Sequence, residues 1–387
     1  MRIAHLISSG GMFGAENVLL NLAQWFNQNG ETVWVGALKD SRSPKLQVID
    51  RAQALNLPVF VVDCRGRFDI NAVFSLKKFI KEHNIEILHT HNYKSDVIGL
   101  LAAKLASIPI VSTAHGFTEV TKSVSWYEKL DRWILKKFFD NVMVVAETVL
   151  DDFHSPRKKV IANGLDITRF ETSKELRQKF RAACHVTEDE TLIGIVGRLS
   201  VEKNQELFIH AAHDFLRQKK NVKFVIVGNG PEEDKLKSLV MAYGLKKEII
   251  FTGLIEDIAG VYQGLDIFSL TSNTEGIPLT ILEAMASRVV VAATNVGGIS
   301  RIVFHRETGM LVEKNDKAGL VKVWQELGED SNLREKLISK AYEYVKNEFS
   351  QSVMAEKYLD CYRDVLSKFP HPNPLPKKGR GGQGTNW

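Results

Sequence analysis

The chain has 387 residues, which favours two domains because a single hydrophobic core rarely grows beyond about 250–300 residues. Hydrophobic residues make up 44% and charged residues 25% of the sequence, a balance that excludes a largely disordered protein. The net charge of +5 comes from Lys and Arg that are mostly dispersed along the chain, which argues against a nucleic-acid-binding protein. This charge suits partners that carry phosphate.

Membrane-spanning and disulfide-bonded proteins do not fit the sequence either. No apolar run reaches the roughly 20 residues that a membrane helix needs, and the first apolar stretch is too short for a signal peptide. Cys64, Cys184 and Cys361 are far apart, with neither metal-site spacing nor a disulfide pattern. We therefore expect a cytoplasmic protein without a metal or cofactor.

Short apolar runs typical of buried strands alternate with amphipathic, helix-like stretches in the first part of the chain. The expected strands are Ile3–Ile7, Thr32–Ala37, Pro58–Val62, Ile85–His89, Ile110–Thr113 and Asn141–Val145. The expected helices include Ala15–Asn29, Ala72–His83 and Ser95–Ala106. This alternation predicts a parallel sheet that is covered by helices on both faces.

The pattern pauses in a polar, charged stretch and then begins again. The later strands are expected at Leu192–Val196, Lys223–Val227, Ile249–Thr252, Asp266–Leu270 and Arg288–Ala292. We predict an α/β protein with two Rossmann-like, doubly wound parallel-sheet domains facing a cleft, at residues 1–165 and 190–345, joined by a linker at 166–189. A helix at 350–367 is expected to pack back on the first domain. The Pro-, Gly- and Lys-rich tail at 368–387 is expected to be disordered.

Two glutamates with seven residues between them flank the start of a helix that follows the expected strand Asp266–Leu270. Gly276 lets the backbone approach a ligand, and Pro278 suits the first helical position, so the free N–H groups there would attract an anion. Glu283 lies among apolar residues and needs partners, such as the two hydroxyls of a ribose. Glu275 precedes the helix and can reach another part of the same ligand. A helix cap by Glu275 and a salt bridge by Glu283 are the structural alternatives.

Two cations stand where an ordinary fold would not favour them. Arg198 closes an apolar strand, and Lys203 stands at the start of the expected helix Asn204–Leu216, where the helix dipole disfavours a cation. A bound diphosphate would reverse both penalties, and two cations can neutralise a leaving diphosphate as its charge develops. A solvated surface pair held by Glu202 and Glu206 is the alternative.

A glycine-rich turn over residues 9–16 follows the first expected strand. Its glycines, which include Gly11 and Gly14, permit close approach of the backbone to phosphate or sugar. The Gly-Gly-x-x-Gly spacing is not the fingerprint of a dinucleotide-binding enzyme.

Three histidines end expected strands of the first domain. His115 precedes a glycine at the end of the fifth strand and is expected to point toward the cleft. His89 and His91 could bind metal as a pair, but the sequence indicates no third ligand near them, so no metal site is predicted.

Taken together, these blocks resemble the family-4 glycosyltransferases, which have the GT-B fold. Glu275 and Glu283 are similar to the family's paired-glutamate signature, and Gly194–Asn204 is similar to its phosphate-binding turn. Phe224–Pro231 resembles the strand and Gly-rich loop beside the donor base, and Val296–Arg301 resembles the segment after the glutamate helix. The resemblance covers about residues 190–315, and a weaker similarity covers 1–165.

The resemblance implies a retaining, metal-independent transfer of a sugar from a UDP- or GDP-sugar to a glycan or lipid-linked acceptor. The associated process would be cell-envelope polysaccharide or lipopolysaccharide synthesis. Catalytic roles are implied for His115, Arg198, Lys203 and Glu275. Donor contacts are implied for Gly11, Gly14, Gly197, Arg198, Lys203, Gly228, Glu275, Gly276, Ile277 and Glu283. Attack on the face from which the phosphate leaves would need no covalent nucleophile.

Three other functions are weighed against this one. A non-hydrolysing sugar-nucleotide epimerase shares the two-domain architecture, but the paired glutamates argue against it. A non-catalytic sugar-nucleotide-binding protein would not need the intact set of cations and carboxylates, and the glycine spacing disfavours a NAD-dependent oxidoreductase.

A basic, aromatic helix is expected over residues 120–139. Such a helix suits contact with an anionic membrane surface, and it equally suits packing on the sheet with its basic side chains covering apolar area. Lipid-linked acceptors, which the resemblance implies, favour a peripheral position at the inner face of the cytoplasmic membrane.

Overall fold

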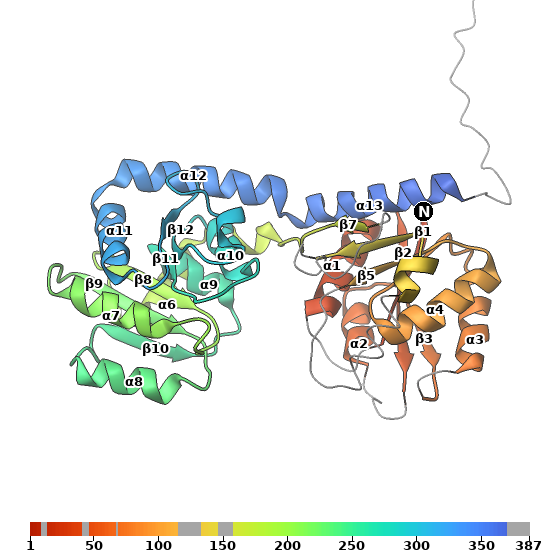
Figure 1. The fold of residues 1–387 in the computed structure, drawn as a ribbon, viewed down its shortest axis with the longest axis horizontal. Helices are drawn as coiled ribbons and strands as arrows, with labels where there is room; N and C mark the ends of the chain where they lie inside the picture. Colours follow the sequence, from red (N-terminus) through yellow and green to blue (C-terminus); the bar gives the residue numbers. More distant parts are fainter. Residues whose placement is uncertain (9–13, 41–45, 67–68, 115–132, 146–157, 370–387) are drawn as a thin grey trace, which may run out of the picture. The chain divides into compact units, whose positions relative to one another are not determined.

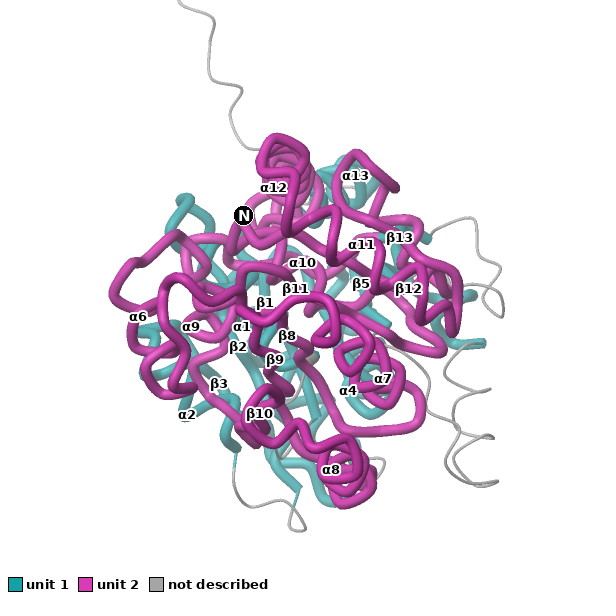
Figure 2. Tube along the Cα trace, turned by 90° about the vertical axis from the view of Figure 1, so that its left-hand side faces the viewer, with its two compact units in different colours: residues 1–145, 152–160, 357–387 teal, residues 146–151, 161–356 magenta. Residues whose placement is uncertain are grey.

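The computed structural model describes residues 1–8, 14–40, 46–66, 69–114, 133–145 and 158–369. The chain forms two compact units, which Figure 1 shows as ribbons and Figure 2 in two colours. Unit 1 comprises residues 1–145, 152–160 and 357–387, and unit 2 comprises residues 146–151 and 161–356. The boundary between the units therefore falls within the C-terminal helix α13 (Gln351–Lys368).

Unit 1 is built on a seven-stranded sheet with the order β3-β2-β1-β4-β5-β6-β7, and its paired strands are parallel. The strands are β1 (Arg2–Ile7), β2 (Thr32–Lys39), β3 (Val59–Asp63), β4 (Ile87–Thr90), β5 (Ile110–Ala114), β6 (Asn141–Val144) and β7 (Lys158–Val160). The helices between them are α1 (Gly14–Gln28), α2 (Gln47–Ala54), α3 (Ile70–Glu82) and α4 (Tyr93–Ala106). Residues 3–7 of β1 are all buried, as expected for a central strand that is covered on both faces.

Unit 2 is built on a six-stranded sheet with the order β10-β9-β8-β11-β12-β13, also with parallel pairs. The strands are β8 (Thr191–Val196), β9 (Val222–Val227), β10 (Ile249–Gly253), β11 (Ile267–Leu270), β12 (Val290–Thr294) and β13 (Met310–Val312). The helices are α6 (Lys174–Ala183), α7 (Gln205–Leu216), α8 (Glu233–Ala242), α9 (Ile258–Gly264), α10 (Leu279–Ala286), α11 (Lys317–Glu329) and α12 (Ser331–Glu348), with short 3-10 turns η2 (Ile167–Phe170) and η3 (Ile299–Arg301).

Alternate residues of these strands belong to two different hydrophobic cores, one on each face of the sheet. On β9, Phe224 and Ile226 join the core that also includes α7, α8 and α11. Val225 and Val227 join the opposite core, which includes α6, α9 and α10. The predicted class, two doubly wound parallel α/β domains, is confirmed.

The structure differs from the sequence-based prediction in the linker between the domains and in two strands at the sheet edges. The segment 166–189, predicted as a linker, contains η2 and α6. The apolar side chain of Phe180 on α6 is 7% exposed and packs in a core of unit 2. The strands β7 and β13 are not among the predicted strands. Each has three residues and lies at a sheet edge, where a continuous apolar run is not needed.

The second part of α13 belongs to unit 1. The hydroxyl of Tyr362 lies 2.6 Å from His89 Nδ1, and that of Tyr358 lies 3.1 Å from Thr113 Oγ1. Across the described parts of the chain, no helix combines the length and apolar character that crossing a bilayer would demand. The predicted disordered tail lies outside the described residues from 370 onward.

Candidate functional site

Two loops at the carboxyl edge of the unit 2 sheet cross at a distance that glycine alone permits. Gly197 and Gly228 have φ angles of +150° and +130°, a region that other residues rarely adopt. A Cβ atom on Gly228 would lie 2.0 Å from the carbonyl oxygen of Gly197. One on Gly230 would lie 2.2 Å from the carbonyl oxygen of Leu199. The predicted glycines therefore hold the loops after β8 and β9 together.

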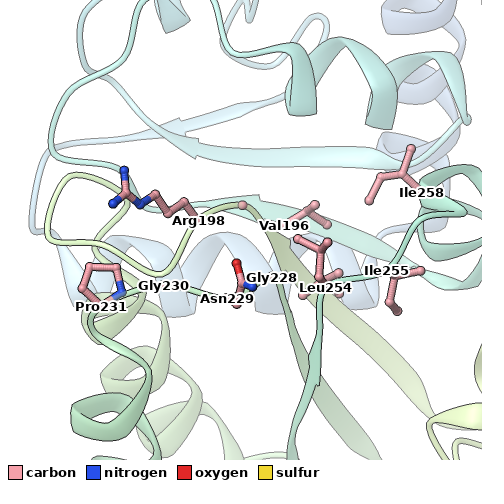
Figure 3. A pocket seen from close by; sticks show the side chains of 11 residues that line it. Val196, Arg198, Gly228, Asn229, Gly230, Pro231, Leu254, Ile255 and Ile258 are labelled. Atoms are coloured by element: carbon pink, nitrogen blue, oxygen red, sulfur yellow. The ribbon is translucent and has the colours of Figure 1, made fainter. Parts of the chain in front are cut away.

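A cavity of about 620 Å³ opens beside this crossing (Figure 3). Figure 3 shows Arg198 and Pro231 toward one end of it, and Ile255 and Ile258 toward the other. Leu254, 72% exposed, also lines the cavity. Among the described lining residues, Arg198 has the only charged side chain. A mainly apolar cavity with few polar groups is typical of a small-molecule site.

Lys203 and Glu275 are brought together at this edge of the sheet. The Lys203 ammonium lies 2.6 Å from Glu275 Oε1, with the two side chains 24% and 9% exposed. The hydroxyl of Ser272 donates to the same carboxylate oxygen at 2.5 Å. Lys203 Cε would lie 3.8 Å from a Cβ on Gly197, so the lysine stem runs along the turn that lines the cavity.

Hydrogen bonds between two loops hold this pair in place. The hydroxyl of Thr271 donates to the carbonyl of Asn204 at 2.8 Å, and the N–H of Asn273 donates to the carbonyl of Glu202 at 2.7 Å. The loop after β8 is thereby fixed against the loop after β11 at several points.

Among the described residues, neither cation forms an ion pair with Glu202 or Glu206, although the Ser200 hydroxyl and, to a smaller extent, the charge of Arg198 lower the pKa of Glu202. Lys203 pairs with Glu275, and Glu206 pairs with Lys235 at 2.6 Å. Arg198 is exposed and has no ion pair with any residue in the described part of the chain. The guanidinium is therefore available to an anion in the cavity.

A second pair of glycines packs closely against the loop that carries Glu275 and Gly276. A Cβ on Gly297 would lie 2.0 Å from the carbonyl oxygen of Glu275, and one on Gly298 would lie 2.2 Å from that of Gly276. A Cβ on Gly276 itself would have no described atom within 4 Å. Pro278 is the N-cap of α10, so the helix begins one residue later than predicted, at Leu279.

Glu283 lies on α10 with a neutral partner. The hydroxyl of Tyr262, on α9, donates to Glu283 Oε2 at 2.8 Å. Burial raises the pKa of Glu283, and the Tyr262 hydrogen bond and the positive charge of Arg169 oppose that rise. Within the described residues Glu283 makes no ion pair, so the salt bridge considered as an alternative does not form there. Tyr262 was not predicted, although a buried tyrosine hydroxyl usually needs a polar partner.

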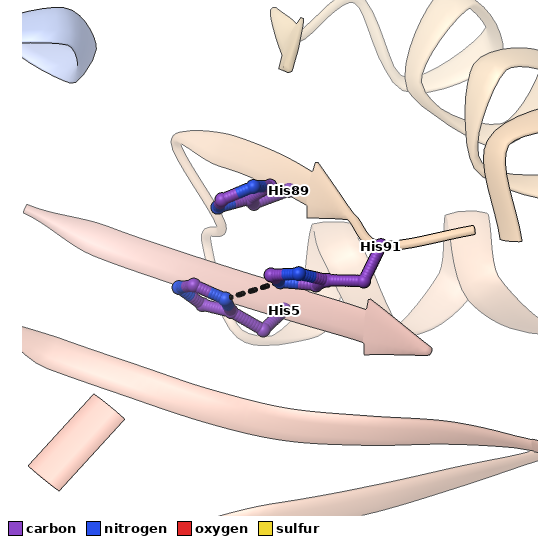
Figure 4. A group of neighbouring side chains, drawn as sticks. All are labelled: His5, His89 and His91. Atoms are coloured by element: carbon purple, nitrogen blue, oxygen red, sulfur yellow. Dashed lines mark hydrogen bonds between the residues drawn. The ribbon is translucent and has the colours of Figure 1, made fainter. Parts of the chain in front are cut away.

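Unit 1 contains a cluster of histidines that the sequence analysis missed in part (Figure 4). The expectation that no third possible ligand lies near His89 and His91 is wrong, because His5 of the neighbouring strand β1 has a ring nitrogen within 4.8 Å of theirs. His5 Nδ1 lies 2.8 Å from His91 Nε2, and burial lowers the pKa of His5 to about 3.

The geometry of this cluster favours hydrogen bonding over metal coordination. Both ring nitrogens of His89 have hydroxyl partners, Tyr362 at 2.6 Å and Thr113 at 2.8 Å. The rings of His89 and His91 are stacked, with an interplanar angle of 26°. The lone pairs of imidazole lie in the ring plane, so stacked rings do not aim at one shared ion.

The remaining predicted residues of unit 1 are only partly placed. Gly11 and His115 lie outside the described residues, and Gly14 is the first residue of α1. Of the expected helix at 120–139, residues 133–138 are helical in the described part. Trp133 is 52% exposed there, and Lys137 Nζ lies 5.1 Å from the centre of its ring.

Comparison with known proteins decides the family. The profile described as "Glycosyl transferases group 1" matches residues 176–344, and "Glycosyltransferase Family 4" matches residues 13–169. The chain is 30% identical over 338 residues to the UDP-Gal:alpha-D-GlcNAc-diphosphoundecaprenol alpha-1,3-galactosyltransferase of Escherichia coli, covering 82% of this chain and 85% of that protein. The chain belongs to the family-4 glycosyltransferases of group 1.

Other relatives agree with this assignment. This family-4 glycosyltransferase is 25% identical over 382 residues to an alpha-1,4-N-acetyl-D-galactosaminyltransferase of Campylobacter jejuni, covering 94% of this chain and 99% of that one. The name of that enzyme gives a glycan on PP-undecaprenol. Among solved structures, Anabaena HepE in complex with UDP matches with a TM-score of 0.77 and 22% identity, over 94% of this chain and 100% of HepE. That likeness shows the GT-B fold of this glycosyltransferase.

Proposed function

We propose that this glycosyltransferase moves a sugar from a UDP-sugar to a glycan or lipid-linked acceptor, with retention of configuration and without a metal ion. The observation that carries the proposal is the meeting of Lys203 and Glu275 beside a cavity whose charged lining side chain is Arg198. A cation for phosphate and a carboxylate for sugar hydroxyls are thereby placed next to each other.

The diphosphate of the donor is assigned to Arg198, Lys203 and the start of α10. Two cations and the free N–H groups of a helix start favour a doubly charged group and stabilise it further as it leaves. Before the donor binds, Lys203 is neutralised by Glu275. An arriving phosphate shares the ammonium, which leaves Glu275 able to accept hydrogen bonds from the transferred sugar.

The nucleoside is assigned to the cavity and to Glu283. The base is assigned to the apolar wall formed by Leu254, Ile255 and Ile258. The Glu283 carboxylate can accept hydrogen bonds from the two ribose hydroxyls. The Escherichia coli relative is named for UDP-galactose and HepE was solved with UDP, which supports uracil as the base. A GDP-sugar is the alternative donor.

The proposed transfer needs no covalent intermediate between the sugar and the enzyme. The bond between the anomeric carbon and the phosphate oxygen breaks, and the acceptor oxygen bonds to the same face of that carbon. The acceptor proton passes to the departing phosphate oxygen, and Arg198 and Lys203 stabilise the charge that remains. The roles that the resemblance implies for His115, Gly11 and Gly14 stay predictions.

The names of two relatives support the proposed acceptor class. The names of the Escherichia coli and Campylobacter jejuni enzymes give diphosphoundecaprenol-linked acceptors, which supports a lipid-linked glycan here. With such an acceptor, the proposed location is the inner face of the cytoplasmic membrane, and the proposed process is envelope polysaccharide or lipopolysaccharide synthesis. Exposed Trp133 beside Lys137 is compatible with contact to that surface.

A donor panel tests the proposal. The protein is incubated with UDP-, GDP- and ADP-sugars, and thermal shift and nucleotide release are measured with and without a polyprenyl-diphosphate glycan. We expect one UDP-sugar to raise the melting temperature, and UDP to be released in quantity only with the acceptor. Release of an epimerised sugar nucleotide without acceptor would contradict the proposal, as would binding of none of the panel.

A further inference from the structure

Tyr262 lies in the core of unit 2 with its ring held on two sides. It is fully buried, and the centres of the Phe170 and Phe268 rings lie 6.2 Å and 5.6 Å from the centre of its own. Such packing restricts the orientation of the ring. Burial of a hydroxyl without a partner would be costly, so the direction in which this hydroxyl points is fixed by where it can donate.

The acceptor for that hydroxyl is Glu283 Oε2, at 2.8 Å. The bond joins α9 to α10, two helices that lie on the same face of the sheet. It takes up one lone pair of one carboxylate oxygen. With respect to the described residues, both lone pairs of Oε1 and the second lone pair of Oε2 can accept further donors, and a ribose supplies two hydroxyls.

An ionised carboxylate can accept both ribose hydroxyls on its two oxygens, whereas protonation turns one of these oxygens into a donor. Burial raises the pKa of Glu283, which favours the protonated form, and the hydrogen bond from Tyr262 and the charge of Arg169 on η2 act in the opposite direction. In the described part of the chain, α12, β11 and β12 also pack near α10 but add no titratable group that shifts this pKa. Tyr262 is thus one of two groups that favour the ionised form against the effect of burial on the pKa of Glu283.

We infer that Tyr262 is a positioning residue for donor binding: its hydroxyl orients the Glu283 carboxylate toward the ribose. The inference rests on the proposed function, because it assumes that Glu283 receives the ribose. A tyrosine that only filled the core would need its ring and not its hydroxyl.

The test compares Tyr262→Phe, Glu283→Gln and the double variant with wild type. Tyr243→Phe is the matched control, because the Tyr243 hydroxyl also has a side-chain partner, His210 at 2.7 Å, outside the lining of the cavity. Titration calorimetry from pH 5.5 to 8 measures the affinity for UDP and for 2′,3′-dideoxy-UDP. GDP and its dideoxy form replace them if the donor panel selects guanine.

For Tyr262→Phe we expect about tenfold weaker UDP binding, or about 1.4 kcal/mol, and little change with dideoxy-UDP. The loss of affinity on acidification should begin at a higher pH than in wild type. In the Glu283→Gln background, Tyr262→Phe should have no further effect, and Tyr243→Phe should bind like wild type.

Two outcomes separate the inference from the proposed function. If Tyr262→Phe binds UDP like wild type at every pH while Glu283→Gln binds weakly, the positioning role is refuted and the ribose assignment stands. If Glu283→Gln also binds UDP like wild type, the ribose assignment itself fails. A loss in Tyr262→Phe that is equal for UDP and dideoxy-UDP would indicate a merely structural role.

Discussion

The ammonium of Lys203 lies 2.6 Å from Glu275 Oε1, so the cation predicted for the phosphates and the carboxylate predicted for the sugar neutralise each other. Each would be costly alone in this half-buried setting, where the two side chains are 24% and 9% exposed. The pair explains how a site built for a charged donor can exist before the donor arrives. It also couples the two recognition tasks, because a phosphate that attracts Lys203 changes the charge beside Glu275.

Lys203→Ala should lower kcat by about 100-fold, because a cation that stabilises the leaving diphosphate is removed. Donor affinity, measured by calorimetry, should fall with it. Lys235→Ala is the control, since Lys235 forms an ion pair of the same length with Glu206 but does not run along the Gly197 turn as the stem of Lys203 does. Turnover and affinity at the wild-type level in Lys203→Ala would remove its phosphate role.

Glu283→Gln should raise the melting temperature at neutral pH. Burial raises the pKa of this carboxyl in the folded protein above the ordinary value of 4.5. Above pH 4.5 the unfolded chain therefore releases this proton more readily than the folded protein, which lowers the free energy of unfolding. Below that value the group is protonated in both states and this effect disappears. Thermal unfolding of both proteins should therefore diverge as the pH rises from 4 to 8, and parallel curves would contradict the assigned environment.

Gly228→Ala should abolish donor binding and lower the melting temperature by several degrees. The added Cβ would lie 2.0 Å from the Gly197 carbonyl oxygen, at a backbone φ of +130°. Gly244→Ala separates clash from backbone strain, because Gly244 has a φ of +68° with no atom within 4 Å of a Cβ. We expect that control to lose only about 1 kcal/mol and to keep donor affinity. Equal effects of the two substitutions would argue against the crossing of the loops as the cause.

Unit 1 should lose stability as the pH falls below about 6.5, the ordinary pKa of histidine. The pKa of His5 is lowered to about 3 by burial, so between these values the unfolded chain binds a proton that the folded chain excludes. The expected slope is about 1.4 kcal/mol for each pH unit. Urea unfolding of wild type and His5→Phe at several pH values measures it. A slope that the substitution leaves unchanged would show that His5 is not the group responsible.

The central strands were predictable because residues buried on both faces form continuous apolar runs, as in residues 192–196 and 224–227. The three-residue edge strand β7 contains two lysines and carries no such signal. The cations and paired glutamates were also visible, since charge at a strand end or within an apolar helix is unusual. Their meeting at 2.6 Å was not, because it depends on how two loops pack.

Tyr262 and His5 escaped sequence reasoning for the same physical reason. Each has its decisive partner on another element: Tyr262 donates to Glu283 across α9 and α10, and His5 bonds His91 across neighbouring strands. In the sequence both residues look like ordinary members of apolar segments. Only the tertiary structure shows that their polar atoms are paired.

A structure of the protein crystallised with UDP, or with GDP if the donor panel selects it, tests the central claim most directly. The account predicts the diphosphate beside Arg198 and Lys203, with the ribose hydroxyls on the Glu283 carboxylate. A nucleotide bound elsewhere, or one whose ribose points away from Glu283, would contradict it.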